Sequence, residues 1–346
     1  MVAQENKMMQ SPGRKRWRKF KANRRGYFSL VIFTLLFCFS LFAELICNDR
    51  PLLVVYQDEL YFPVFKIYPE TTFGGVFETE TDYGDPYFIE LLSNEGDKVI
   101  FAPVRFSFNT INYAIDGQLP SPPTKRNILG TDDRGRDVFA RLLYGFRLSV
   151  IFGLLLTAAG MVLGIIAGAI QGYFGGKTDI LLQRLIEIWS SMPELYLLII
   201  FASMFKPSVM LLFVLLTLFG WMGLADYVRA EFLKGRNLDY VKAAKALGVS
   251  DPIIMYRHLL PNSIVPVITF LPFRLSASIL ALTSLDFLGL GVPPSTPSLG
   301  ELLAQGKANI DAWWISITTI AVLVGTLILL IFIGEGFREA FDPRKK

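Results

Sequence analysis

The sequence has few residues that could build a metal or redox site. Among its 346 residues are one histidine and two cysteines, and charged residues make up 18% against 52% hydrophobic residues. A zinc site needs three or four His, Cys or carboxylate ligands, so a histidine-rich catalytic metal centre and a cysteine zinc cluster are excluded. Soluble proteins usually carry about 25% charged residues, so this chain is too apolar to be an ordinary soluble enzyme.

Long apolar runs account for the scarcity of charge. A helix needs about 20 apolar residues to cross about 30 Å of hydrocarbon. Six runs approach this length: Tyr27–Cys47, Leu148–Ile170, Leu181–Phe205, Val209–Val228, Ile264–Leu285 and Trp314–Ile333. The third run contains Pro193, and the fifth contains Pro266, Pro272 and Arg274. We therefore predict an all-α, multi-pass membrane protein with six transmembrane helices.

The first run could also be a secretion signal that is cleaved. It is longer than the 7–15 apolar residues of a signal peptide, and no small-residue cleavage site follows it. We interpret it as the first transmembrane helix, 26–47. Both cysteines, Cys38 and Cys47, lie in it. They would be about 13 Å apart along a helix, which is too far for a disulfide.

The distribution of charge predicts the orientation. Residues 1–25 hold nine Lys or Arg, from Lys7 to Arg25, against one acid, Glu5, whereas residues 48–146 hold nine basic and 15 acidic residues. The positive-inside rule then places both termini in the cytoplasm, including Arg338, Arg344, Lys345 and Lys346 at the end. The same rule places the loop Arg229–Asn262 inside, and Trp313 and Trp314 would mark the outer interface. The basic N-terminus could suggest nucleic-acid binding, but a basic run beside a membrane helix is the ordinary topology signal and attracts anionic lipid.

The acidic segment 48–146 divides into two parts. The insert 48–128 contains LLVVYQ, YFPVFKIY and KVIFAPVRFSF, which resemble short strands separated by turn residues and predict a small β-rich periplasmic insert. It could be a plain surface insertion or a docking surface for a soluble partner. Residues 129–146 are predicted to form an amphipathic helix along the outer membrane surface, with Val138, Leu142, Leu143 and Phe146 on its apolar side. Its charged start, Asp132, Asp133, Arg134, Arg136 and Asp137, indicates ion pairs and helix capping rather than catalysis.

Glycines and charges within the apolar runs suggest packing and a polar path. Four glycines lie four residues apart and share one helix face, where another backbone can approach closely: Gly160, Gly164, Gly168 and Gly172. In the third run, Arg184, Glu187 and Glu194 would lie near one face of a single helix. Buried charges in a membrane either pair or line a cavity. Arg274, Glu187 and Glu194 are therefore candidates for a translocation path, with structural pairing as the alternative.

The stretch Gly172–Asp179 resembles a phosphate-binding loop but does not match one. The pattern requires a glycine five residues before Gly176, where this chain has Gln171. No strand precedes it, so ATP binding here is not expected. We interpret Gly175 and Gly176 as a tight turn.

The loop 237–262 predicts two short helices that project from the membrane. Tyr240, Ala243, Ala244 and Leu247 would share one face of the first helix, with Lys242 and Lys245 on another. Asn237 or Asp239 could cap its start and Gly248 its end. Ser250 could cap the second helix, with Pro252 in its first turn, and Pro261 would stop it at Leu260.

This loop resembles the coupling loop of ABC importer permeases. The family pattern is Glu-Ala-Ala, three residues, Gly, nine residues, then Ile-x-Leu-Pro, and Ala243, Ala244, Gly248, Leu260 and Pro261 match it. Lys242 stands in place of the Glu and His258 in place of the Ile. Three more segments are similar to the dipeptide and oligopeptide permease family: LGTDDRGRDVFARLLYG, FLGLGVPPSTPSLGELL and IGEGFREAFDPR. The insert and the stretch from Leu282 to Ile310 are most similar to the Yej-type permeases of oligopeptide and microcin C importers.

The resemblance implies a type I importer permease with a core at 147–334 and a cytoplasmic C-terminus at 335–346. It implies a homologous second permease, two ABC ATPase domains that use ATP and Mg²⁺, a periplasmic solute-binding protein and a peptide substrate in the bacterial inner membrane. The chain itself would bind no cofactor and catalyse no reaction. Alternatives are a permease of the same family for nickel or an opine, or a secondary transporter. The roles of Lys242 and His258 stay open; His258 could be a pH switch or a plain contact or capping residue.

Overall fold

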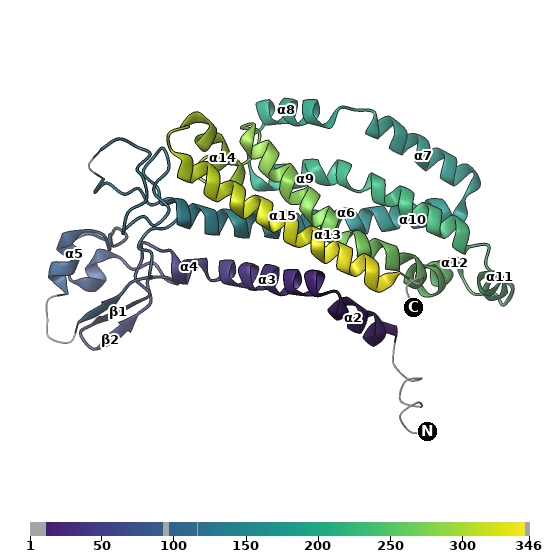
Figure 1. Cartoon of the computed structure of the whole chain (residues 1–346), viewed down its shortest axis with the longest axis horizontal. Helices are drawn as coiled ribbons and strands as arrows, with labels where there is room; N and C mark the ends of the chain where they lie inside the picture. The colour runs from purple at the N-terminus through teal and green to yellow at the C-terminus, as the bar shows by residue number, and fades with distance from the viewer. Residues whose placement is uncertain (1–11, 93–96, 116, 343–346) are drawn as a thin grey trace, which may run out of the picture.

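The structure, a computed structural model, describes residues 12–92, 97–115 and 117–342. It shows an elongated bundle of helices with a small irregular lobe at one end (Figure 1). Lys7 and the basic residues Arg344, Lys345 and Lys346, which the orientation prediction used, lie outside the described residues. The long elements of the bundle are α3 (Arg24–Leu41), α6 (Val138–Phe174), α9 (Val209–Gly220), α10 (Met222–Gly235), α13 (Leu260–Phe287) and α15 (Trp313–Phe341).

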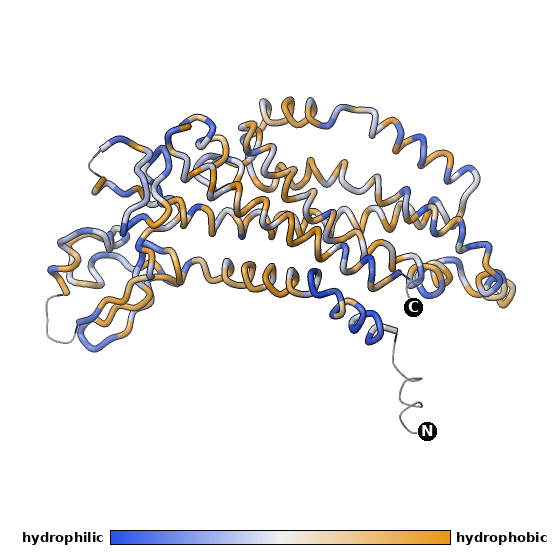
Figure 2. The backbone as a smooth tube through the Cα atoms, in the orientation of Figure 1, coloured by the Kyte–Doolittle hydropathy of each residue, from blue (hydrophilic) through white to orange (hydrophobic). Residues whose placement is uncertain are grey.

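Within the described part of the chain, five helical stretches are long and apolar enough to cross a membrane, with α9 and α10 counted together. A sixth crossing exists if the pair α7 (Gly176–Ser190) and α8 (Glu194–Met204) is one span, although these two helices meet at 66°. The bend falls at Pro193, which has no backbone N–H to continue the helix. Glu187 and Glu194 therefore lie on two helices, and the prediction that they share one helical face was wrong. In Figure 2 the hydrophobic residues follow α3, α6 and α15 along their lengths.

The helix predicted at 129–146 begins nine residues later than expected. Thr131–Asp137 form turns and isolated bridges, and α6 begins at Val138, where the Asp137 carboxylate accepts a hydrogen bond from Ala140 N at 2.8 Å. Val138, Leu142, Leu143 and Phe146 are all at most 8% exposed, because they pack inside the bundle. The prediction of an amphipathic helix lying on the membrane surface was wrong. Instead α6 continues unbroken for 37 residues, about 55 Å.

The lobe contains a small antiparallel sheet in the order β2-β1-β3: β1 (Leu53–Tyr56), β2 (Glu59–Tyr61) and β3 (Lys98–Ile100). Val54 pairs with Tyr61 on one side and Val99 on the other. The strands are shorter than expected, since 62–68 and 101–108 are irregular. Phe73 fills the centre of a separate aromatic core with Tyr83 and Phe88, so side-chain packing rather than strand pairing holds most of the lobe. This lobe also contains the 3₁₀ helix η1 (Glu70–Phe73) and α5 (Pro86–Leu91).

The N-terminal helices pack along α15. Asn23 separates α2 (Pro12–Ala22) from α3, accepts a hydrogen bond from Gly26 N at 2.9 Å and donates one to Glu339 at 2.7 Å. A Cβ on Gly26 would lie 3.0 Å from the backbone of Gly336, so the small residues let α3 and α15 approach. Phe20 stacks on Phe337 with ring centroids 4.8 Å apart.

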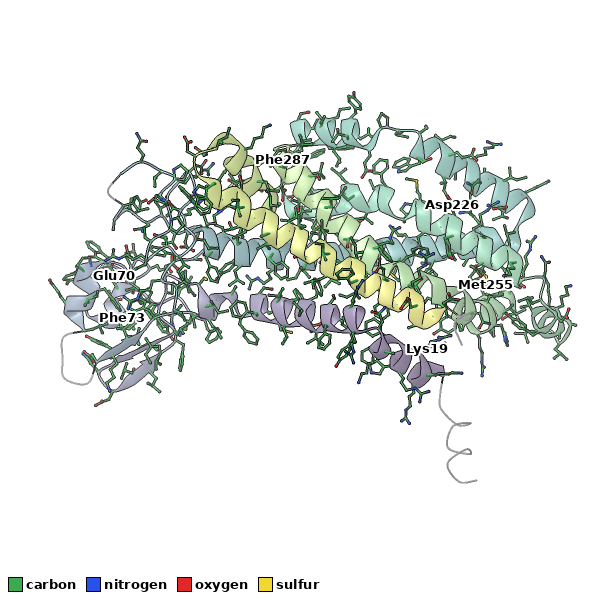
Figure 3. The ribbon with its side chains drawn as sticks, in the orientation of Figure 1. Lys19, Glu70, Phe73, Asp226, Met255 and Phe287 are labelled. Carbon is green, nitrogen blue, oxygen red and sulfur yellow. The ribbon has the colours of Figure 1, made fainter. Side chains whose placement is uncertain are left out.

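The first helix, α2, and the C-terminal end of α15 lie at the same end of the bundle as α11 (Asp239–Ala246) and α12 (Asp251–Ile253). This end is opposite the lobe (Figure 1). Figure 3 shows the same separation, with Phe73 at the lobe end and Met255 at the other. At the lobe end, α4 (Ala43–Ile46) leads into the lobe and α14 (Leu299–Ala308) lies beside the start of α15. Trp314, predicted as an interface anchor, is 7% exposed, and its indole donates to Thr131 O at 3.2 Å. Trp313 is 58% exposed.

Candidate functional site

The first projecting helix, α11, ends at Gly248 as its position predicts. Gly248 has φ +80°, its N–H donates to Lys245 O at 3.0 Å, and Val249 N donates to Ala244 O at 3.1 Å. This pair of bonds is a Schellman motif, which a residue in the left-handed conformation completes and which glycine adopts without steric cost. The start differs from the prediction. Leu238 is the N-cap residue and makes no side-chain capping bond, so neither Asn237 nor Asp239 caps the helix.

Pro261 does not stop the second helix, contrary to the prediction. Ser250 precedes α12 without a side-chain capping bond, and Pro252 lies in the first turn as expected. A π-helical segment, η2 (Ile254–Leu259), then carries the chain directly into α13, where Leu260 has helical φ and ψ of −55° and −44°. A π-helical turn changes the hydrogen-bond register, so the missing N–H of Pro261 need not interrupt the helix. The second part of the projecting loop, from Asp251, and α13 are thus one helical body.

The exposed face of α11 contains Tyr240, Ala243 and Leu247, of which Leu247 is 84% exposed. Ala244 was predicted on the same face but is 8% exposed. It packs inward with Val241, at 3%, because both belong to the cluster that also contains Phe232 and Ile254. Val241 was missed. Its spacing of three from Ala244 was the available signal, since residues three apart share a helix face.

Polar contacts fix this loop to its neighbours. The Tyr173 hydroxyl at the end of α6 donates to Asp251 at 2.5 Å, and Arg236 donates to Tyr173 O at 3.1 Å. Lys245 lies 4.0 Å from Asp251, whereas Lys242 is exposed. His258 is half-buried in η2, and its carbonyl accepts a bond from Asn262 at 3.3 Å.

The glycine stripe of α6 lies against α9 and α10. A Cβ on Gly160 would lie 3.3 Å from Gly220 O, and one on Gly164 would lie 2.9 Å from Trp221 O. A Cβ on Gly168 would lie 2.4 Å from Ala225 O, and one on Gly172 would lie 2.5 Å from Arg229 O. Real side chains do not fit at such distances, so the four glycines allow the backbones of α6 and α10 to touch.

The candidate path residues are separated in space. Arg184 pairs with Glu187 at 2.6 Å on the exposed surface of α7, while Glu194 begins α8. The Arg274 guanidinium of α13 donates to Gly220 O, at the junction of α9 and α10. Arg229 pairs with Asp179, with Nη2–Oδ2 at 2.7 Å, which closes the turn at Gly175 and Gly176.

A buried ion network at the lobe end extends the predicted one. Asp132 pairs with Arg136 at 2.6 Å, as the sequence predicted. Arg141, 0% exposed, also reaches Asp132 at 3.5 Å and Glu301 at 2.9 Å. The contact between Arg141 and Glu301 was not predicted, because the two residues lie 160 positions apart in the sequence. Arg136 also donates to Pro294 O at 2.9 Å, so the network joins the start of α6 to the loop before α14. Burial raises the pKa of the neighbouring Asp137, although hydrogen bonds from Ala140 and Asn127 oppose this effect.

Comparison with known proteins adds three findings. Residues 160–346 match the family described as "Binding-protein-dependent transport system inner membrane component" and 11–60 match "N-terminal TM domain of oligopeptide transport permease C". The chain is 54% identical over 330 residues to the inner membrane ABC transporter permease protein YejE of Escherichia coli K12, covering 95% of this chain and 96% of that one. It is 50% identical to the peptidoglycan transport system permease protein YejE of Agrobacterium fabrum, covering 96% and 93%. The oligopeptide transport system permease protein OppC of Haemophilus influenzae is 36% identical, over 64% of this chain and 71% of that one.

Proposed function

This chain belongs to the family of binding-protein-dependent transport system inner membrane components, and from that premise we propose that it is the permease subunit of an ATP-driven peptide importer. The observation that carries the proposal is the projecting loop 237–262, which lies within the matched region and whose second part, from Asp251, is continuous with α13. A rigid projection at one end of a membrane helix can pass a rigid-body movement from an external subunit into the membrane.

The orientation follows from charge. Nine Lys or Arg residues in 1–25 favour a cytoplasmic N-terminus in a multi-pass protein of the bacterial inner membrane. The described ends and the loop 237–262 lie together, and the acidic lobe lies at the opposite end, which supports a periplasmic lobe (Figure 1). The basic segment of α2 then meets anionic lipid at the inner surface.

The loop is the proposed contact with an ATPase. Tyr240, Ala243 and Leu247 supply an exposed apolar face, with Lys242 and Lys245 beside it, and this face docks into a groove of one of two ABC ATPase domains. Ala244 and Leu260 pack beneath the face in the cluster that contains Val241, the exposed Pro261 follows in the first turn of α13, and His258 contributes a contact at the edge of the face. The ATPase subunits bind and hydrolyse ATP with Mg²⁺, and this chain contributes the movement of its helices.

The remaining partners follow from the same family. A second, homologous permease completes the pathway, and a periplasmic solute-binding protein delivers peptide to the lobe end. Arg274, Glu187 and Glu194 are the candidate polar residues of the path, since charged groups at membrane depth face a cavity or a partner. Gly160 of the glycine stripe lies against Gly220 O, the acceptor of the Arg274 hydrogen bond, so the stripe places α6 beside Arg274.

The names of two relatives indicate two candidates for the cargo, oligopeptides and peptidoglycan fragments. We propose oligopeptides, including peptide antibiotics of the microcin C type, as the main class. The Agrobacterium relative is named for peptidoglycan transport, which favours peptidoglycan-derived peptides as a second candidate.

Reconstitution of the complete transporter tests the function. Proteoliposomes that contain both permeases, both ATPases and the binding protein should take up a labelled tripeptide when ATP and Mg²⁺ are supplied. A complex with a hydrolysis-deficient ATPase is the matched control and should show no uptake. The soluble binding protein should bind oligopeptide or peptidoglycan peptide and not Ni²⁺. Preference for Ni²⁺, or uptake that is independent of ATP, would reject the proposal.

A further inference from the structure

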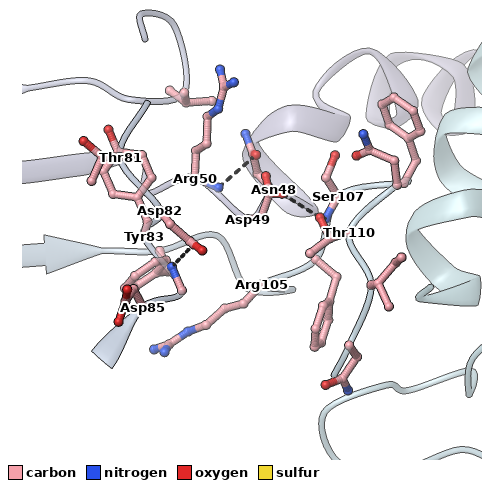
Figure 4. A pocket seen from close by; sticks show the side chains of 18 of the residues that line it. Asn48, Asp49, Arg50, Thr81, Asp82, Tyr83, Asp85, Arg105, Ser107 and Thr110 are labelled. Atoms are coloured by element: carbon pink, nitrogen blue, oxygen red, sulfur yellow. Dashed lines mark hydrogen bonds between the residues drawn. The ribbon is translucent and has the colours of Figure 1, made fainter. Parts of the chain in front are cut away.

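A large cavity lies between the lobe and the helical bundle. Its volume is about 1030 Å³, and it is bounded by the end of α4, by residues 80–85 and by residues 101–114, with Tyr144 of α6 at its base. We call it the seam pocket, because two separate hydrophobic clusters flank it. One cluster contains Phe73 and Tyr83 of the lobe, and the other contains Cys47 and Tyr144 of the bundle. Figure 4 shows its polar side chains.

The base of the seam pocket is made of buried polar groups. Asn48, Thr81, Tyr83 and Tyr144 are each between 4% and 7% exposed. Three of them use their polar atoms internally, for example Tyr144, which donates to Cys47 O at 3.0 Å. The Tyr83 hydroxyl is buried beside the Thr81 side chain and makes no hydrogen bond of full geometry among the described residues. A base lined by polar groups is suited to a polar ligand.

The rim of the seam pocket carries uncompensated negative charge. Glu44 pairs with Arg147 at 2.8 Å, and Glu80 pairs with Arg50. Asp49, Asp82 and Asp85 have no ion pair within the described ranges. Their only basic neighbour on the rim without a carboxylate partner is Arg105, whose guanidinium lies over the Phe101 ring at 4.5 Å. The rim therefore favours a cationic ligand.

Two carboxylates each keep one oxygen available. Asp49 accepts a hydrogen bond from the Thr110 hydroxyl at 2.6 Å through Oδ2, and Asp82 accepts one from Gly84 N at 2.9 Å through Oδ1. These bonds hold both carboxylates in fixed orientations at the rim (Figure 4). Asp49 Oδ1 and Asp82 Oδ2 remain for a ligand. Across the described residues no group of three or more His, Cys, Asp or Glu is arranged to hold a metal ion.

We propose that the seam pocket binds a short cationic peptide, with a lysine, arginine or terminal ammonium group paired to Asp49 and Asp82. A cavity of several hundred to about 1,000 Å³ suits a small ligand, whereas protein partners usually dock on a broad surface of about 800 Å² on each side. The aromatic walls, Phe101, Phe108 and Tyr113, cover the apolar parts of such a peptide. The choice of peptide rests on the proposed function; the charge preference rests on the seam pocket alone.

The site is separate from the shared transport core. Most of its lining lies within residues 64–144, between the two matched family regions at 11–60 and 160–346. Both YejE relatives match over at least 95% of this chain, so their alignments extend over the lobe. The seam pocket therefore joins residues outside the matched regions to the end of the N-terminal one, which contains Asp49, and can sort cargo by charge at the outer end of the permease.

Direct binding to the full-length permease in lipid nanodiscs tests the proposal, without the binding protein or the ATPases. The probes are fluorescently labelled Lys-Ala-Lys and Glu-Ala-Glu. We expect Lys-Ala-Lys to bind at least tenfold more tightly, and its affinity to fall as salt is raised, because partly exposed ion pairs are screened. Equal binding of the two peptides would overturn the proposal, whatever the transport assay of the complete importer shows.

Matched variants locate the site. Asp49→Asn and Asp82→Asn keep the oxygens that accept the Thr110 and Gly84 bonds but remove the charge, and each should weaken Lys-Ala-Lys binding about five- to tenfold. Asp58→Asn, on the same lobe but outside the seam pocket, should change it less than twofold. Circular dichroism and melting should match wild type for all three. If the seam-pocket variants bind Lys-Ala-Lys normally, or weaken only docking of the transporter's binding protein, the peptide assignment is wrong.

Discussion

The guanidinium of Arg141, in the first turn of α6, donates a hydrogen bond to the carboxylate of Glu301 in α14 at 2.9 Å. Arg141 is 0% exposed, so this contact joins two distant segments inside the protein rather than on its surface. Asp132 and Arg136 complete the same network. A buried charge that loses its partner raises the free energy of the folded state. The stability of the lobe end of the bundle therefore depends on this pair.

Removing one charge of this pair should destabilise the permease. Glu301→Gln leaves the buried Arg141 with Asp132 as its remaining carboxylate, at 3.5 Å. We expect a loss of about 3 kcal/mol, at the low end for a broken buried pair because Asp132 remains. The measurement is thermal unfolding of purified protein in detergent. The control Glu78→Gln is exposed and should melt as wild type; equal melting of both variants would contradict the network.

The glycine stripe should not tolerate even a methyl group at its tightest position. In Gly168→Ala the new Cβ would lie 2.4 Å from Ala225 O, which forces α6 and α10 apart. We expect about 1–3 kcal/mol of destabilisation and reduced yield of folded protein. Gly223→Ala is the control, because nothing lies within 4 Å of its Cβ. Size-exclusion profiles and melting should separate the two variants.

The end of α11 should control coupling. Gly248→Val places a β-branched side chain at φ +80°, which costs at least 1–2 kcal/mol locally and distorts the loop that docks on the ATPase. In the reconstituted importer, ATP hydrolysis should continue while uptake per ATP falls severalfold. Gly117→Val is also at positive φ, with open space around it, but lies in the lobe and should leave coupling unchanged. Normal coupling in Gly248→Val would refute the assignment of the loop.

Arg274 gives a test of the translocation path. Arg274→Ala removes the donor to Gly220 O, and we expect lower peptide uptake while the four-domain complex still assembles on size-exclusion chromatography. Arg274→Lys keeps the charge and should retain more uptake than the alanine variant. If both variants transport as wild type, Arg274 is a structural contact between helices and not part of the path.

Cys47 should resist thiol reagents in the folded protein. The Cys47 side chain is 0% exposed and packs in the cluster that contains Ala140 and Tyr144. A buried thiol in apolar surroundings is inert, because the reagent cannot reach the sulfur. In a Cys38→Ser variant, N-ethylmaleimide should label the protein only after denaturation. Rapid labelling of the native variant, measured by mass spectrometry, would contradict the burial of Cys47.

Local backbone chemistry made part of the structure predictable. Gly248 ends α11 and the four-residue glycine spacing places one face of α6 against α10, because these effects depend on residues close in sequence. The contact of Arg141 with Glu301 was not predictable, since nothing in either segment specifies a partner 160 positions away. The burial of the Ala244 side chain likewise depends on packing with Phe232 and Ile254, which belong to other elements.

Two other errors came from treating proline and apolar spacing as local signals. Pro261 predicted a helix end, but the π-helical segment before it absorbs the change in register. The apolar positions of 129–146 predicted an interfacial helix, whereas these side chains pack inside the bundle and the preceding charged run forms the ion pair and helix cap that its residues predicted. In each case tertiary packing decided between conformations that the local sequence allowed.

The unbroken helical body from Asp251 to Phe287 has a mechanical consequence. Its 37 residues span about 55 Å, from η2, which packs against the α11 helix of the proposed ATPase contact, to the lobe end of the bundle. If it pivots near its middle, a tilt of about 10° displaces each end by about 5 Å in opposite directions, close to one helical turn. The body then works as a lever with nearly equal arms, so inward movement of the loop at one face is matched by outward movement of Asp286 and its neighbours at the other.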